Sequence, residues 1–99
     1  MLFAILCIDK KDGDALRSAK VTQHLDYLHT GKAVKLAGPF MDASGNMNGS
    51  LLIVEAKDYA AAESWAAAEP FNRAGLVELV EIRGWFSVMN SLVPASRVS

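Results

Sequence analysis

The sequence contains two histidines, His24 and His29, and their imidazole side chains are the ones best suited to acid–base chemistry near neutral pH. Both lie in a segment whose apolar residues recur at helical spacing. His24 falls beside the apolar stripe that contains Val21 and Leu28, which predicts a position at the margin of the core. There it either transfers protons or simply caps the edge of the core. His29 lies near the predicted C-terminal end of the helix, where a protonated imidazole interacts favourably with the helix dipole.

Two carboxylates are candidate partners for such an imidazole. Glu69 directly precedes Pro70, at the boundary between two helical segments. A carboxylate held there can orient an imidazole and fix its tautomer, or it can act only as a helix N-cap. Asp9 ends the first apolar run and is either a pocket carboxylate or a turn residue. The candidate catalytic residues are therefore His24, Glu69 and Asp9.

Candidate substrate-binding residues lie in three further places. Arg17 has a planar fork of N–H donors that suits an anionic group. Gly38-Pro39 and Gly49-Ser50 are positions where the backbone can approach a ligand closely, although ordinary hairpin turns also explain them. The sequence contains no Walker loop, CxxC, HExxH or GxSxG motif. We therefore expect neither a metal nor an organic cofactor.

Seven predicted elements must position these side chains. Continuous apolar runs indicate strands, and residues that recur at three to four positions indicate helices. The first run is interpreted as a strand and not as a targeting peptide, because no basic residue precedes it. The expected elements are strand 2–8, helix 15–30, strand 33–37 stopped by Gly38-Pro39, strand 50–55, helix 59–68, a helical turn 70–73 and strand 76–88. A hairpin loop at 42–49 is expected to join the second and third strands.

Capping and turn residues set the expected boundaries. Asp12 or Asp14 is expected to cap the first helix, and Asp58 is expected to cap the second. Gly84 interrupts the last strand and predicts a bulge or bend. The order β-α-β-β-α-β predicts a ferredoxin-like α+β fold, in which a four-stranded antiparallel sheet carries two helices on one face.

Length and composition set the domain organisation and the partners. The 99 residues are enough for one domain, expected over residues 1–90 with a C-terminal tail at 91–99. The 52% hydrophobic content exceeds what so small a globule can hide, which predicts a homodimer through the open face of the sheet. The net charge of −1 without a basic stripe argues against nucleic acid, and no apolar run is long enough for a membrane helix.

The single cysteine, Cys7, excludes an intrachain disulfide. This fits a reducing compartment, and we expect a cytoplasmic location.

The order and spacing of several short motifs together resemble those of the YciI-like family, over about residues 1–90. The motifs are Arg17 and His24 in the first helix, Gly38-Pro39, Gly49-Ser50, residues 66–70 and Ala74-Gly75-Leu76. The resemblance implies a ferredoxin-like domain that forms a dimeric α+β barrel, with a pocket between the sheet and the first helix.

The resemblance also implies a histidine–aspartate pair, with His24 as the histidine. The family has Asp-Pro where this chain has Glu69-Pro70, so the carboxylate keeps its charge on a longer arm and Asp9 remains an alternative partner. Two functions follow as hypotheses. One is a small cofactor-free isomerase or lyase that transfers protons on a small organic acid. The other is a non-catalytic dimer that binds a metabolite.

Overall fold

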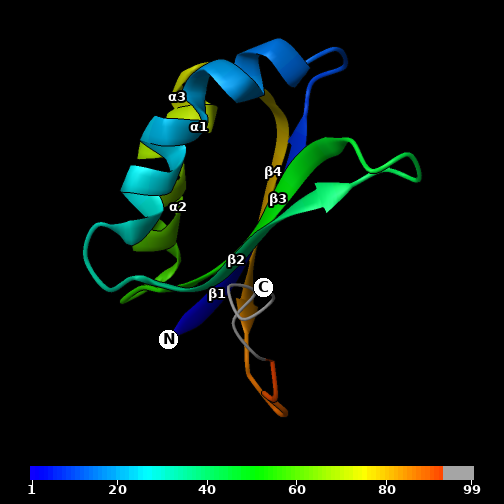
Figure 1. The fold of residues 1–99 in the computed structure, drawn as a ribbon. Helices are drawn as coiled ribbons and strands as arrows, with labels where there is room; N and C mark the ends of the chain where they lie inside the picture. The colour runs from blue at the N-terminus through cyan, green and yellow to red at the C-terminus, as the bar shows by residue number, and fades with distance from the viewer. Residues whose placement is uncertain (93–99) are drawn as a thin grey trace.

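The structure is a computed structural model that describes residues 1–92 (Figure 1). None of the helices in this range is long and apolar enough to cross a membrane. The elements are β1 (Leu2–Asp9), α1 (Asp14–His29), β2 (Val34–Met41), β3 (Met47–Glu55), α2 (Tyr59–Ala68), α3 (Pro70–Arg73) and β4 (Val77–Trp85).

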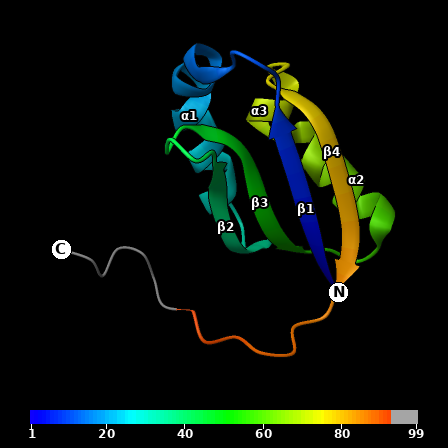
Figure 2. The ribbon, with the colours of Figure 1, turned by 90° about the vertical axis from the view of Figure 1, so that its right-hand side faces the viewer.

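The four strands form one antiparallel sheet in the order β2-β3-β1-β4. All three helices lie on the same face of this sheet, and Figure 2 shows the opposite face without a covering helix. This is the predicted ferredoxin-like βαββαβ arrangement. The two predicted long helices and the short helical turn are also confirmed.

Alternation along β1 divides its side chains between the two faces of the sheet. Phe3, Ile5 and Cys7 are buried beneath the helices. Ala62 and Ala66 of α2 pack into the same core. Small residues on α2 let the helix approach the sheet closely, so that the larger strand residues fill the space between them.

Strand β2 does not stop at Gly38-Pro39, as the sequence had predicted. It continues to Met41, and Pro39 pairs with Ser50 of β3. Proline is tolerated because β2 is an edge strand, where a missing N–H leaves no neighbouring strand unpaired. The hairpin turn is correspondingly shorter than expected, and β3 begins at Met47.

Three boundary predictions also need correction. Neither Asp12 nor Asp14 caps α1, because the N-cap is Gly13 and no side-chain hydrogen bond is made there. The β1–β4 ladder is regular at Gly84, and its irregularity lies between Ile8 and Asp9 instead. Strand β4 ends at Trp85, and most of the predicted 91–99 tail lies outside the described residues.

Candidate active site

Helix α1 places Arg17 and His24 on the side that faces the sheet. The two residues are seven positions apart, about two helical turns, so they lie on one face of the helix. Both are buried, with 8% and 7% of their surfaces exposed. Val21 and Leu25 lie between and beside them and are partly exposed at the margin of the core.

His24 is paired with Glu69. Its Nδ1 is hydrogen-bonded to Oε1 of the Glu69 carboxylate, and both side chains are buried. The second carboxylate oxygen of Glu69 accepts from the backbone N–H groups of Phe71 at 3.0 Å and Asn72 at 3.3 Å. Glu69 is therefore the N-cap of α3 and the partner of the imidazole at once, so its two sequence-based interpretations are not exclusive.

The pairing selects the tautomer of the neutral imidazole. An ionised carboxylate can only accept hydrogen bonds, so Nδ1 carries the hydrogen and donates it to Glu69. The lone pair of a neutral His24 is then on Nε2. This is the arrangement that a general base requires.

Phe71 fixes the plane of the imidazole. Its ring stacks on His24 with a centroid separation of 4.0 Å and an interplanar angle of 14°. The Cζ atom of Arg17 lies over the same ring, 4.6 Å from its centroid. Phe71 was not identified from the sequence. The only available signal was its place after Pro70, in a helical segment too short to show a period.

Arg17 forms a second buried network. Its Nε donates to Oδ2 of Asp9 at 2.8 Å, and its Nη2 donates to Oδ1 of Asp9 at 3.1 Å. Nη2 also donates to the carbonyl oxygen of Gly49 at 2.9 Å and to Oγ of Ser50 at 3.2 Å. Of the two carboxylates that the sequence left open, Glu69 contacts His24 and Asp9 contacts Arg17.

Gly49 brings β3 close enough to β1 for this network to form. A Cβ atom at this position would lie 2.4 Å from the carbonyl oxygen of Cys7 and 3.0 Å from the ring of Phe40. No side chain fits there without displacing the backbone. At Gly38, by contrast, a Cβ atom would meet nothing within 4 Å.

A pocket of about 280 Å³ opens between α1 and strands β2 and β3. Most of its wall is apolar, and the polar side chains in it are those of Arg17, His24 and Ser50. Asp9 and Glu69 are not in the wall but lie behind Arg17 and His24. The full lining is Arg17, Val21, His24, Leu25, Leu28, Ala37, Gly38, Pro39, Met47, Ser50 and Leu52.

The structure thus gathers the five predicted residues Arg17, His24, Gly38, Pro39 and Ser50 around one cavity. The sequence interpretation missed the apolar wall residues. Val21 and Leu28 had been assigned to the apolar stripe at the core, and Leu25 lies beside them on the same helix. Periodicity alone cannot tell a residue that faces a cavity from one that faces the core.

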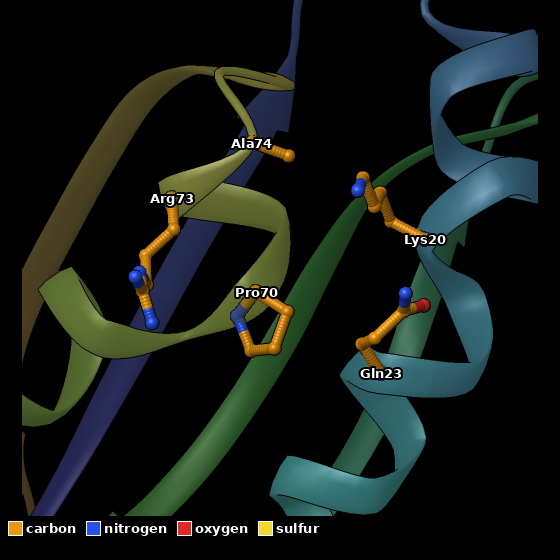
Figure 3. Close-up of a pocket in the computed structure, with 5 residues that line it drawn as sticks. All are labelled: Lys20, Gln23, Pro70, Arg73 and Ala74. Carbon is orange, nitrogen blue, oxygen red and sulfur yellow. The ribbon is translucent and has the colours of Figure 1, made fainter.

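A second hollow, of about 310 Å³, lies between α1 and α3. Figure 3 shows Lys20 and Gln23 on α1 across from Pro70 of α3 and from Ala74, which directly follows α3. Within the described part of the chain, its lining includes Arg73 but neither a histidine nor a carboxylate. The cavity beside His24 contains the imidazole that is paired with Glu69, so it is the candidate active site, and we call it the His24 pocket.

Cys7 lies on β1 on the helix-facing side of the sheet. Burial, with the nearby Glu69 and Asp9 carboxylates, raises the pKa of the Cys7 thiol to about 11. A thiol with this pKa is protonated near neutral pH and is a poor nucleophile. Residues 1–92 also contain no group of three or more His, Cys, Asp or Glu side chains placed to hold a metal ion.

Comparisons with known proteins agree with this architecture. Protein YciI of Escherichia coli O6:H1 and protein YciI of Shigella flexneri are each 32% identical over 92 residues, covering 84% of this chain and 94% of the relative. A solved structure of 5-chloro-2-hydroxyhydroquinone dehydrochlorinase (TftG) from Burkholderia phenoliruptrix AC1100, in complex with 2,5-dihydroxybenzoquinone, has a TM-score of 0.81. It is 30% identical, and the alignment covers 87% of this chain and 94% of that one.

A family model for the YCII-related domain matches residues 1–86. The match covers both helix–sheet halves of the fold and every residue of the His24 pocket. The resemblance expected from the sequence is confirmed, and the chain belongs to the YCII-related domain family.

Proposed function

We propose that this protein is a small enzyme that transfers a proton on a small cyclic substrate with an acidic C–H or O–H group, as an isomerase or a lyase, with His24 as the base. One observation carries the proposal. A buried imidazole, held by Glu69 and stacked on Phe71, lies in the wall of an otherwise mostly apolar cavity. All the groups that this chemistry needs come from the chain itself.

The proposed step begins with transfer of a proton from an acidic C–H or O–H of the substrate to Nε2 of His24. The imidazolium that forms is hydrogen-bonded to the Glu69 carboxylate, which offsets its charge in a buried site. Return of the proton to another atom completes an isomerisation. If the electron pair instead expels a leaving group, the products are an unsaturated compound, the leaving group and the proton held by His24.

The structural neighbour supports a cyclic substrate of this kind. TftG is a dehydrochlorinase of a chlorinated hydroxyhydroquinone, and its complex holds 2,5-dihydroxybenzoquinone. Both compounds are six-membered rings that carry oxygen atoms. A cavity of about 280 Å³ with mostly apolar walls suits a single ring of this size.

Hydrogen exchange tests the proposal directly. We expect the protein to accelerate exchange of acidic ring hydrogens for deuterium in a panel of small cyclic ketones, enols and phenols in D2O. Loss of the substrate proton signal in ¹H NMR spectra measures this rate, which should scale with protein concentration. Compounds that bind without any exchange would favour the alternative, a non-catalytic metabolite-binding dimer.

We also propose that the protein is a cytoplasmic homodimer, paired through the open face of the sheet. The open face carries partly exposed apolar side chains from three strands. These are Ile8 of β1, Leu36 of β2, and Leu79 and Trp85 of β4, with 40–57% of their surfaces exposed. An apolar face of this kind is typical of a subunit interface.

Charge placed on the open face is expected to separate the subunits. Leu79 is 57% exposed, so Leu79→Lys should leave the monomer fold intact while burying an unpaired charge in the proposed dimer. Sedimentation equilibrium should then show a dimer for the wild type and a monomer for the variant. A wild-type monomer at micromolar concentration would contradict the proposed interface.

A further inference from the structure

The hydroxyl group of Ser50 lies in the wall of the His24 pocket with one of its hydrogen-bonding positions already used. Its Oγ accepts a hydrogen bond from Nη2 of Arg17 at 3.2 Å, and Ser50 is 4% exposed. A guanidinium has donors only, so Arg17 cannot accept the hydroxyl hydrogen in return. No other hydrogen bond of this hydroxyl is found among residues 1–92.

The surroundings of Ser50 turn this hydrogen into a strong donor. Oγ accepts from a cation, and a hydroxyl that accepts such a hydrogen bond donates more strongly through its own O–H. Leu52, two residues later on the same face of β3, and Pro39 of β2 supply apolar wall on either side. The hydroxyl hydrogen is therefore free to donate to a molecule in the pocket.

From this geometry we propose that the O–H of Ser50 binds an oxygen atom of the substrate, on the ring position next to the hydrogen that His24 removes. The inference rests on the proposed function and narrows its substrate class. The ligand is a small ring that carries a carbonyl or enol oxygen, and it is not a carboxylate.

The proposed contact between Ser50 and the ring oxygen acts during the proton transfer. When Nε2 of His24 takes a proton from the carbon beside a carbonyl group, the electron pair of the broken C–H bond shifts toward the carbonyl carbon. The carbonyl π pair moves onto the oxygen, which becomes an enolate. A donor already aimed at that oxygen stabilises the charge as it develops.

The Asp9–Arg17 pair explains why a carboxylate fits less well. Both oxygens of Asp9 bind the guanidinium of Arg17, so its positive charge is already compensated. An additional carboxylate would lose its hydration in a mostly apolar pocket without gaining a free cation. A ring oxygen that is neutral in the ground state has no such cost.

A pair of ring compounds that differ only at the oxygen position tests the inference. Cyclohexanone carries the carbonyl oxygen, and methylenecyclohexane has a carbon in its place. Binding to ¹⁵N-labelled protein can be followed by NMR titration. We expect Ser50→Ala to weaken cyclohexanone binding about fivefold, the size of one net hydrogen bond, and to leave methylenecyclohexane binding unchanged.

Two further measurements keep the result decisive. Ser50→Thr retains a hydroxyl group and should restore cyclohexanone binding. In the wild type, the ¹³C carbonyl signal of bound cyclohexanone should move downfield, a test that needs no variant.

An equal change of both affinities in Ser50→Ala, or no change in either, would overturn the role of Ser50. An unshifted carbonyl signal would do the same. The deuterium exchange assay reports on His24 independently, so failure of the Ser50 inference is distinguishable from failure of the proposed function.

Discussion

Replacing His24 with glutamine is expected to slow deuterium exchange on a responsive ring compound about 10²- to 10⁴-fold, the usual contribution of a positioned general base. The variant loses the Nε2 lone pair. Among residues 1–92, the other nitrogen-bearing side chain in the wall of the His24 pocket is that of Arg17. A guanidinium stays protonated at all ordinary pH values, so it cannot replace the imidazole. Exchange rates measured by ¹H NMR at several pH values would give the loss.

Glutamine is the informative substitution because it preserves the contact behind the histidine. Its side-chain amide can donate to the Glu69 carboxylate, so the buried carboxylate keeps a hydrogen-bond partner and the N-cap of α3 is retained. The far-UV circular dichroism spectrum and the urea midpoint should therefore stay close to those of the wild type. Loss of exchange without loss of folding assigns the effect to the missing base.

His29 provides the matched control. It lies at the end of α1, is exposed and does not line the His24 pocket. His29→Gln should exchange ring hydrogens at the wild-type rate. A His24→Gln protein that retains the wild-type rate would refute the assignment of the base, whichever compound is used.

The element order was predictable because each signal is local. Apolar runs of strand length, the caps Asp58 and Glu69, and the position of Pro70 are all readable along the chain. The fate of Pro39 was not predictable in this way. A proline is compatible with a strand only at an edge, and the edge position of β2 depends on the order of strands in the finished sheet.

The candidate site was predictable in its members but not in its pairing. His24, Glu69, Arg17 and Asp9 were all identified by chemical type, yet either carboxylate suited the imidazole. Register decides between them. The partners Cys7–Ser50 and Ile8–Gly49 bring the end of β1 beside the start of β3, so Asp9 meets Arg17 in the first turns of α1. Glu69, at the start of α3, reaches His24 about two helical turns further along α1.

The buried Asp9–Arg17 pair leads to the second large expected effect. The two side chains are 4% and 10% exposed, so removing one charge leaves the other uncompensated in the interior. We expect Asp9→Asn to lower the free energy of unfolding by about 3–5 kcal/mol, measured by urea denaturation. Small domains are only marginally stable, so this loss is a large fraction of the total free energy of unfolding.

A double variant separates the cost of an unpaired charge from the loss of packing. Arg17→Met introduced together with Asp9→Asn removes the remaining buried charge and keeps an apolar stem over Phe71. The double variant should regain more than half of the stability lost in Asp9→Asn alone. If Asp9→Asn costs less than about 1 kcal/mol, Arg17 is not held as a compensated pair, and the argument against a carboxylate substrate fails with it.

The single variant Asp9→Asn also tests what the pocket can bind. The preference for a neutral ring oxygen depends on the compensation of the Arg17 charge by Asp9. In the wild type, Asp9 compensates the guanidinium, and cyclohexanone should bind more tightly than cyclohexanecarboxylate. In Asp9→Asn the guanidinium keeps its contacts to Gly49 and Ser50 but gains a free positive charge beside the cavity. The affinity of the variant for cyclohexanecarboxylate should therefore rise relative to its affinity for cyclohexanone. NMR titration without urea, at a pH where the variant is folded, would measure this change in preference.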